Sequence, residues 1–379
     1  MKICDVVLNS IWYDPRVRKQ LVSYLDNGNE TVCVGFHCER YDAQKVAELP
    51  CPATIVDIGE EYRGQLPSLR LKLRRLRLKH KAICDAIVAY HPDVIHANDL
   101  NVLIGAYRAS RKLKCRLVYD AHEINSENIG SDKTAKIMKR VMAFVERYIM
   151  KRTDINICTN HAAADYFAET YHIDPPMVVT NCTLNKEVVH CEGKNPGFEI
   201  LNHGRFYAGR GYDLMVEAAP LLADCPDVVL AIRGYGTMED QLHSRCAELN
   251  TENVKFYPPV RVEALISEAS ASRVGVAITE PICLNFKLSV SNKLFEYAAA
   301  GLPVIMSDIP EHRYLNDKYH FGIILAENTP DAFAEAVRRL YGDREFYEAC
   351  AAGAARLSSE INWESDFGAL LTKEQSLCR

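Results

Sequence analysis

The chain has 379 residues, of which 48% are hydrophobic and 25% are charged, and its formal net charge is −5. This length suits two globular domains of ordinary size, and this composition excludes a largely disordered chain. The negative net charge excludes binding through a global basic field, so we expect no nucleic-acid partner.

The sequence positions of the fourteen cysteines are typical of core residues rather than of disulfides or zinc ligands. None forms a Cys-x-x-Cys pair, and several lie within apolar runs, such as Cys4 and Cys158. Cys33, His37 and Cys38 lack a second pair of metal ligands. No apolar run approaches the ~20 residues that cross a bilayer, and the chain begins with a predicted strand rather than a signal peptide. We therefore expect a cytoplasmic protein.

Short apolar, β-branched runs alternate with helical patterns from end to end. The predicted strands of the first half are 3–8, 31–36, 53–58, 93–96, 116–120, 155–159 and 178–180. Those of the second half are 198–202, 228–233, 254–257, 274–278, 303–307 and 322–325. Continuous apolar strands separated by helices predict parallel sheets covered on both faces.

Thirteen strands exceed one compact open sheet, so the sequence predicts an α/β protein with two Rossmann-like domains. The periodic pattern is lost over 184–197, where Asn, Gly, Lys and Pro gather. We expect an N-terminal domain over 1–183, a linker over 184–197 and a C-terminal domain over 198–360. A helix within 361–379 should return to the first domain. Ligands of such sheets bind at the carboxyl ends of the strands, here in a central cleft.

A basic run over 68–90 is compatible with one long helix. A local basic cluster within it comprises Arg70, Lys72, Arg74, Arg75, Arg77 and Lys79. On an acidic protein this local charge favours contact with anionic lipid head groups, on the inner face of the cell membrane. The alternative is a solvated helix whose leucines pack on the sheet.

Two arginines, Arg205 and Arg210, occupy a loop after the first strand of the second half. Gly204 precedes them, and Arg210 lies between Gly209 and Gly211 at the expected start of a helix. Forked guanidinium donors at the positive end of a helix suit a diphosphate. The alternative is a pair of solvated surface arginines.

The next strand is followed by Gly234 and Gly236, which would let backbone amides approach an anion. Thr237 is placed to cap a helix that begins near residue 238. The same glycines would also suit a plain strand-to-helix turn.

A third helix start follows at residues 289–305. Ser291 or Asn292 can cap a helix over 293–300, which Gly301 ends. Asn292 and Lys293 would lie at its positive end, where a phosphate is favoured. Glu296 lies one turn further on the same side, suited to the paired hydroxyls of a ribose; the alternative is a surface carboxylate.

These stretches together resemble the glycosyltransferase family 4 group, retaining enzymes of the GT-B fold. SNKLFEYAAAGLPVI is similar to the donor-binding motif of the subgroup with the sequence Asn-Lys-Leu-Phe-Glu-Tyr. HGRFYAGRGYD resembles the phosphate loop of the family and RGYGTMED resembles its Gly-x-Gly loop. DPRVRKQLVSYLDNGNETVCV, DVIHANDLNVL and LVYDAHEIN resemble N-domain segments in the usual order.

The resemblance implies roles for the residues of the second half. Arg205 and Arg210 would hold the distal phosphate of the donor and stabilise it as a leaving group. Glu296 would bind the ribose, while Asn292 and Lys293 would frame the diphosphate. Gly204, Gly234 and Gly236 would belong to the donor-binding loops.

In the first half, His122 matches the histidine of the family that faces the sugar. Glu123 is a candidate partner beside it, and Asp14 and Arg16 are candidate cleft residues. The sequence departs from the family at Leu288, where relatives carry a second glutamate eight positions before the ribose glutamate. Glu280 could replace that glutamate if the intervening loop folds back.

The implied activity is retaining transfer of a hexose-type sugar from a UDP- or GDP-sugar to a glycan or lipid-linked acceptor, in cell-surface polysaccharide synthesis. No Asp-x-Asp pair is present to hold Mg²⁺, in agreement with the metal independence of the family, so neither metal nor cofactor is expected. Two alternatives are a sugar-nucleotide epimerase of the same fold and a non-catalytic protein that binds nucleotide sugars.

Overall fold

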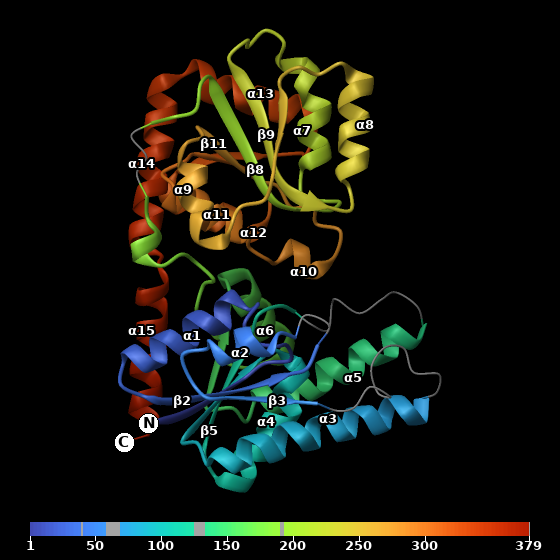
Figure 1. The fold of residues 1–379 in the computed structure, drawn as a ribbon, viewed down its shortest axis with the longest axis vertical. Helices are drawn as coiled ribbons and strands as arrows, with labels where there is room; N and C mark the ends of the chain where they lie inside the picture. The colour runs from blue at the N-terminus through green and yellow to red at the C-terminus, as the bar shows by residue number, and fades with distance from the viewer. Residues whose placement is uncertain (39–40, 58–68, 125–132, 190–192, 379) are drawn as a thin grey trace. The chain divides into compact units, whose positions relative to one another are not determined.

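A computed structural model of the chain describes residues 1–38, 41–57, 69–124, 133–189 and 193–378. The chain divides into two compact units, of which unit 1 comprises Met1–Val179 and Asp366–Arg379 and unit 2 comprises Thr180–Ser365. Figure 1 shows a sheet flanked by helices in each unit.

Unit 1 contains a parallel sheet of seven strands among the described residues, in the order β3-β2-β1-β4-β5-β6-β7. The strands are β1 (Lys2–Val6), β2 (Glu30–Phe36), β3 (Ala53–Val56), β4 (Val94–Asn98), β5 (Arg116–Ala121), β6 (Ile155–Cys158) and β7 (Met177–Val178). The helices are α1 (Pro15–Asp26), α2 (Ala43–Ala47), α3 (Leu69–Tyr90), α4 (Leu100–Leu113), α5 (Lys133–Met150) and α6 (His161–Tyr171).

Unit 2 contains a parallel sheet of six strands within the described ranges, in the order β10-β9-β8-β11-β12-β13. The strands are β8 (Phe198–Phe206), β9 (Val228–Gly236), β10 (Val254–Tyr257), β11 (Val274–Ala277), β12 (Val304–Ser307) and β13 (Gly322–Leu325). The helices are α7 (Tyr212–Ala218), α8 (Glu239–Leu249), α9 (Leu265–Ser270), α10 (Leu284–Lys287), α11 (Asn292–Ala299), α12 (Pro310–Tyr319), α13 (Pro330–Gly342) and α14 (Arg344–Glu360).

The predicted α/β architecture with two parallel sheets is confirmed, and each of the thirteen predicted strands is present. Their apolar side chains are buried because helices cover the sheets. In unit 2, Ile200 of β8 and Ile232 of β9 share a core cluster with Phe333 of α13. The predicted strand 53–58 ends at Val56, and its last residue lies outside the described ranges. Cys4, Cys33 and Cys158 are buried, as predicted for core residues.

The last helix, α15 (Trp363–Leu377), contributes its final residues to unit 1. Phe367 packs edge-on against Tyr24, with ring centroids 5.0 Å apart. The Tyr24 hydroxyl donates to Glu374 at 2.8 Å and lies 2.8 Å from Nδ1 of His96. The three polar groups are buried, and burial raises the pKa of Glu374 to about 7. A buried polar cluster therefore joins α15 to α1 and β4.

Candidate functional site

Strands β8 and β9 extend beyond their predicted ends, and the candidate site lies at these extended ends. The prediction that β8 stops at residue 202 is wrong, because pairing continues through Gly204 opposite Gly234 and through Phe206 opposite Gly236. A Cβ on Gly234 would lie 1.8 Å from the Gly204 carbonyl oxygen, and one on Gly236 would lie 2.2 Å from the Phe206 oxygen. Only glycine permits this close approach of the two backbones.

The loop after β8 turns sharply into α7 and positions Arg210. Gly209 and Gly211 have φ values of +79° and +77°, which favour glycine. A Cβ on Gly211 would also lie 2.6 Å from Cβ of Ile278. Gly211 is the residue before the first turn of α7, so Arg210 is held at the start of that helix.

The Arg210 guanidinium is fixed by partners from two other elements. Its Nη1 donates to Oγ1 of Thr279 at 3.3 Å, and its Cζ lies 4.7 Å from the ring centroid of Phe286 and 5.3 Å from that of Tyr207. Its buried Nε finds no hydrogen-bond partner in the described part of the chain. A pre-oriented cation with an unused donor suits an anionic ligand.

Arg205 lies at the end of β8, opposite Tyr235, and is exposed to solvent. Among the residues that the structure describes it makes no hydrogen bond or ion pair, so its guanidinium is available to a ligand.

Lys293 lies in the first turn of α11 and points back to β8. Its Nζ donates to Oδ1 of Asn202 at 2.7 Å and to the Tyr212 hydroxyl at 3.2 Å. Gly204 leaves it room, since a Cβ there would lie 3.3 Å from Cε of Lys293. Burial lowers the pKa of Lys293 to about 7 and the charge of Arg210 lowers it too, whereas Glu296 acts in the opposite direction. Two cations are therefore held close together, an arrangement that a bound anion would stabilise.

Glu296 is held by a residue that the sequence analysis did not single out. Nε2 of His203 lies 2.7 Å from Oε2 of Glu296, so this ring nitrogen donates to the carboxylate. His203 is 2% exposed, and its ring lies 4.7 Å from that of Tyr297. Its backbone N–H donates to the Tyr297 hydroxyl at 3.1 Å. In the sequence, only its position just before Gly204 could have identified His203 as a site residue.

The remaining predicted residues of unit 2 lie around the same strand ends. Asn292 is exposed at the start of α11, and Ser291 occupies the capping position without a side-chain hydrogen bond. Glu280 lies beside the arginine loop, because its backbone N–H donates to the Gly209 oxygen at 3.0 Å. Leu288 ends α10 and is half-buried.

The predicted capping by Thr237 is wrong. Met238 occupies the capping position of α8 without a side-chain bond. The Thr237 hydroxyl instead donates to the Phe206 oxygen at 3.4 Å, because β9 continues to Gly236 and leaves Thr237 beside the end of β8.

In unit 1, His122 lies at the end of β5 among three polar partners. Its Nε2 lies 3.0 Å from Oδ1 of Asn98 and 3.4 Å from Oδ2 of Asp120, and its Nδ1 lies 3.5 Å from Oδ2 of Asp99. Burial alone would lower the pKa of His122, but the carboxylates of Asp99 and Asp120 outweigh it and raise the pKa to about 9. The ring is therefore a cation at neutral pH, and its side chain is 15% exposed.

Asp99 adopts a strained backbone conformation, with φ of +68°. Such a conformation costs about 1–3 kcal/mol in a residue other than glycine, and it recurs at functional sites. Asp99 accepts from the backbone N–H of His122 at 3.1 Å, so the strained residue fixes both the ring and the main chain of His122.

The structure places the two candidate residues of the first loop in structural roles. Arg16 is 3% exposed, and its Nε and Nη2 donate to the two oxygens of Asp120 at 2.8 and 3.0 Å. Its Nη1 donates to the Val179 oxygen at 2.8 Å. Asp14 caps α1, where it accepts from the backbone N–H of Val17. Glu123 is exposed beside His122.

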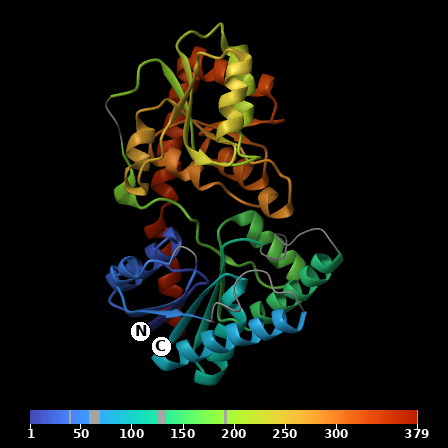
Figure 2. The ribbon, with the colours of Figure 1, turned by 45° about the vertical axis from the view of Figure 1, so that its right-hand side comes forward.

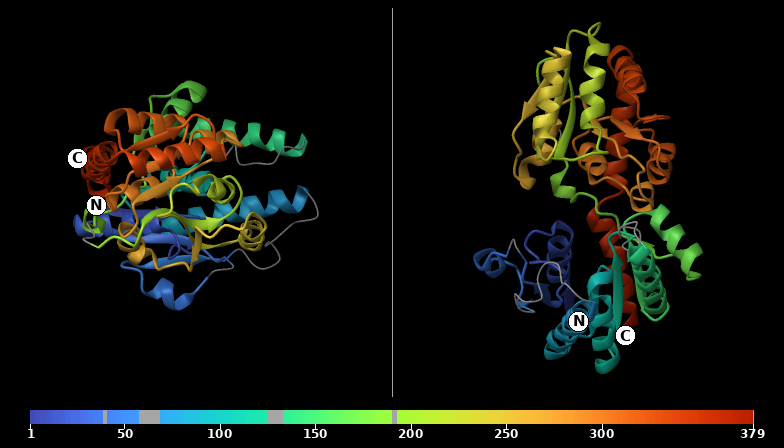
Figure 3. Two further views of the ribbon diagram at one scale, coloured as in Figure 1. Left: turned by 90° about the horizontal axis from the view of Figure 1, so that it is seen from above. Right: turned by 90° about the vertical axis from the view of Figure 1, so that its right-hand side faces the viewer.

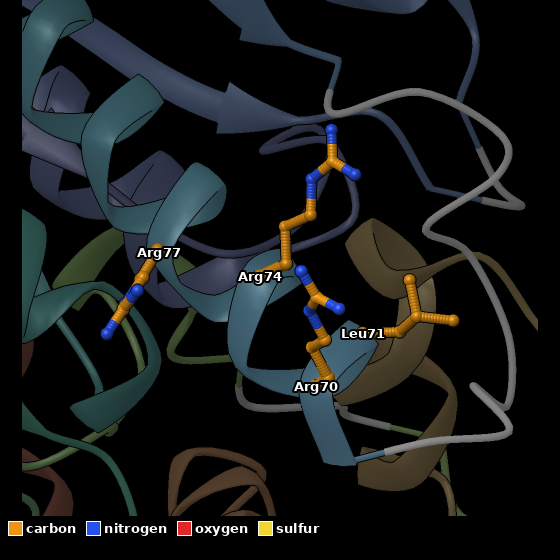
Figure 4. A pocket seen from close by; sticks show the side chains of 4 residues that line it. All are labelled: Arg70, Leu71, Arg74 and Arg77. Carbon is orange, nitrogen blue, oxygen red and sulfur yellow. The ribbon is translucent and has the colours of Figure 1, made fainter.

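The basic helix α3 is confirmed as one element, although it begins at Leu69. Arg70, Arg74 and Arg77 are exposed, whereas Lys79 is half-buried and the side chain of Lys72 lies outside the described residues. A pocket of about 600 Å³ is lined by the three arginines and Leu71. Figure 4 shows Arg70 and Arg74 directed to the same side of the helix.

Each half of the chain matches the model of a known protein family. Residues 20–185 match the model "Glycosyltransferase Family 4", and residues 197–343 match the model "Glycosyl transferases group 1". This chain is a family 4-like glycosyltransferase of the GT-B fold. No curated protein sequence matches this glycosyltransferase significantly.

Solved structures share the fold of this glycosyltransferase over its full length. Sucrose-phosphate synthase from Thermosynechococcus elongatus is 16% identical with a TM-score of 0.77, and the match covers 100% of this chain and 99% of that one. HepE from Anabaena, solved with UDP and glucose, is 16% identical with a TM-score of 0.69, over 99% and 100% of the two chains. A putative UDP-N-acetylglucosamine 2-epimerase from Listeria monocytogenes is 13% identical with a TM-score of 0.64, over 98% and 94%.

Across the described ranges, no helix combines the length and apolar character that a membrane span requires. Within the same ranges, no three His, Cys, Asp or Glu side chains are grouped so that they could hold a metal ion.

Proposed function

We propose that this glycosyltransferase moves a hexose-type sugar, with retention of configuration, from a nucleotide diphosphate sugar to a glycan or lipid-linked acceptor in cell-surface polysaccharide synthesis. The observation that carries the proposal is the juxtaposition of Arg210 and Lys293 at the starts of α7 and α11. Arg210 offers an unused buried donor. Burial and the nearby charge of Arg210 lower the pKa of Lys293 to about 7. A diphosphate would satisfy both groups.

The proposed chemistry places negative charge where these cations lie. As the anomeric C–O bond breaks, charge develops on the distal phosphate, and Arg205, Arg210 and Lys293 would stabilise it without a metal. For front-face transfer with retention, the acceptor hydroxyl attacks the anomeric carbon on the side from which the phosphate departs. The leaving phosphate takes the acceptor proton, so that one C–O bond breaks, one forms and the nucleotide diphosphate leaves protonated.

Glu296 is proposed to accept hydrogen bonds from the ribose hydroxyls. The hydrogen bond from His203 keeps its carboxylate in one orientation, which reduces the entropy lost on binding. The donor base is proposed to be uracil or guanine, and the UDP bound to HepE favours UDP as the first nucleotide to test.

In unit 1, the cationic ring of His122 is proposed to orient a hydroxyl of the donor or acceptor. The carboxylates of Asp99 and Asp120 keep the ring protonated, so that it would act as a hydrogen-bond donor rather than as a base.

A peripheral position on the inner face of the cell membrane is part of the proposal. The exposed Arg70, Arg74 and Arg77 of α3 would contact anionic lipid head groups at about 1 kcal/mol each. A lipid-linked acceptor would then lie in the same membrane.

A sugar-nucleotide epimerase is the second candidate, favoured by the similarity to the epimerase structure from Listeria monocytogenes. Incubation with donor alone separates the two activities. An epimerase would convert the donor into a second nucleotide sugar, whereas a transferase would require an acceptor. A non-catalytic binding protein would bind the donor and release no product in either case.

Thermal unfolding with UDP- and GDP-sugars tests the proposed donor directly. A cognate nucleotide at about 100 times its Kd should stabilise the protein by about 2.7 kcal/mol and raise its Tm measurably. Product analysis with an acceptor, followed by NMR of the anomeric configuration, then tests transfer and retention. No stabilisation by any nucleotide sugar would contradict the assignment.

Nucleotide affinity should depend on pH through Lys293. Its pKa is about 7 in the free protein, and a bound diphosphate would raise it. Affinity for UDP should therefore be full below pH 7 and fall as the pH rises above 7, with proton uptake on binding at pH 8. Calorimetry in buffers of different ionisation enthalpy measures that uptake. Lys293→Met should abolish both the uptake and the pH dependence, and a wild-type affinity that stays constant from pH 6 to 9 would contradict the prediction.

A further inference from the structure

Helix α5 presents an apolar stripe to solvent that the proposed activity does not use. Ile137, Val141 and Phe144 follow one another at helical spacing, with Met138 beside them, and Phe144 and Ile137 are 69% and 64% exposed. Side chains at i, i+4 and i+7 lie on one helix face. The end of the same helix is anchored, because Ile149 and Met150 are buried in unit 1.

Buried hydrogen bonds fix the orientation of this helix. Glu146 is fully buried and accepts from the hydroxyls of Tyr119 at 2.5 Å and Tyr171 at 2.7 Å. Arg147 donates to the Tyr171 oxygen at 3.1 Å. Because these contacts hold one face of α5 against β5 and α6, the opposite face with Phe144 is held outward.

The stripe lies in strongly basic surroundings. Residues 133–145 contain four basic and no acidic residues, and residues 69–81 of α3 contain seven basic and no acidic residues. The chain as a whole carries a net charge of −5, so these two segments concentrate its positive charge. Figures 1, 2 and 3 show that α3 and α5 extend to the same side of unit 1.

The positive charge around the α5 stripe indicates which kind of partner would bind it. A second copy of the chain, packed stripe to stripe, would bring two sets of four basic residues together, which is unfavourable. Nucleic acid would neutralise the basic residues but would leave Phe144 and Ile137 exposed to water. An anionic lipid surface satisfies both features, because phosphate head groups lie beside an apolar interior.

We infer that the apolar stripe of α5, with Phe144 and Val141 at its centre, inserts into the acyl region of an anionic bilayer while α3 contacts the head groups. This inference rests on the proposed membrane contact of α3 and adds to it a second, apolar attachment. Basic residues alone bind reversibly and are screened by salt, whereas inserted side chains resist salt. The two attachments would orient unit 1 on the membrane and present it to a lipid-linked acceptor.

Tryptophan fluorescence of the full-length Phe144→Trp variant tests insertion directly. The added indole should shift its emission to shorter wavelength with vesicles of phosphatidylglycerol and be quenched by lipids brominated in the acyl chains. Val262→Trp in unit 2, at a residue that is 69% exposed, should show neither effect. An unshifted and unquenched Phe144→Trp emission would overturn the inference, whether or not the protein binds the vesicles.

Vesicle sedimentation separates insertion from head-group contact. At about 1 M salt, where charges are screened within about 3 Å, residual binding should persist in the wild type and fall about tenfold or more in Val141→Ser/Phe144→Ser. Arg70→Glu/Arg77→Glu should lose binding mainly at low salt. If only this second variant loses binding, α3 contacts the membrane and the insertion of α5 is wrong. Transfer to a soluble acceptor should be equal in all variants, so loss of transfer would point to a failure of the proposed function instead.

Discussion

Replacing Arg210 with alanine should lower kcat for sugar transfer by about two to three orders of magnitude, the usual effect of removing one donor that stabilises developing negative charge. The guanidinium is pre-oriented by Thr279 and by the rings of Phe286 and Tyr207, so a flexible side chain would not replace it. Arg210→Lys should recover only part of the rate, because lysine lacks the planar fork of donors.

The measurement is initial rates of nucleotide release at saturating donor and acceptor. A matched control is Arg338→Ala in the same unit, which removes an exposed pair with Asp224 and should leave kcat unchanged. If Arg210→Ala retained a rate within about threefold of the wild type while its Tm stayed constant, the phosphate assignment of this loop would be wrong.

Asp120→Ala should destabilise unit 1 by about 3–5 kcal/mol, the cost of leaving a buried charge without its partner. The carboxylate accepts two hydrogen bonds from Arg16 and one from Gln20 at 2.7 Å, and both Asp120 and Arg16 are almost fully buried. Urea unfolding monitored by circular dichroism measures the loss. Asp224→Ala, which breaks an exposed pair with Arg338, should cost less than about 1 kcal/mol.

The ion pair of Asp120 also predicts that the protein loses stability in acid. Burial would raise the pKa of Asp120, but the charges of Arg16 and His122 outweigh it and hold the pKa well below the ordinary value. A lowered pKa in the folded state contributes stability that is complete above the unfolded pKa of about 3.9 and is lost as the pH falls through the folded pKa. Asp120→Ala should remove this part of the acid dependence, and an unchanged acid profile would count against the ion pair.

The strands were predictable because their signal is local. Runs such as residues 228–233 are apolar and β-branched, and strands buried on both faces of a parallel sheet require that composition. The ends of β8 and β9 were not predictable, because Gly204 and Gly234 resemble turn residues until their pairing across the sheet is known. A glycine that permits close approach and a glycine that turns the chain look alike in one sequence.

The candidate site was predictable as a set of motifs but not as a set of contacts. Arg210, Lys293 and Glu296 stand out beside glycines and helix starts, whereas the partners that fix Arg210 come from other elements. Thr279 and Phe286 carry no signal of their own, because their role arises from folding. Arg16 is the opposite case: the sequence made it a candidate cleft residue, but its guanidinium is buried against an aspartate 104 positions away.

The packing of α15 onto unit 1 has a consequence for biosynthesis. Tyr24 and His96 are covered by side chains that are translated more than 250 residues later. While the first half of the chain emerges from the ribosome, the Tyr24 hydroxyl and the His96 imidazole are therefore exposed. They become buried only after Phe367 and Glu374 have been synthesised. An expression fragment that ends at residue 183 should aggregate or fold incompletely, and adding the α15 peptide in trans should restore its solubility.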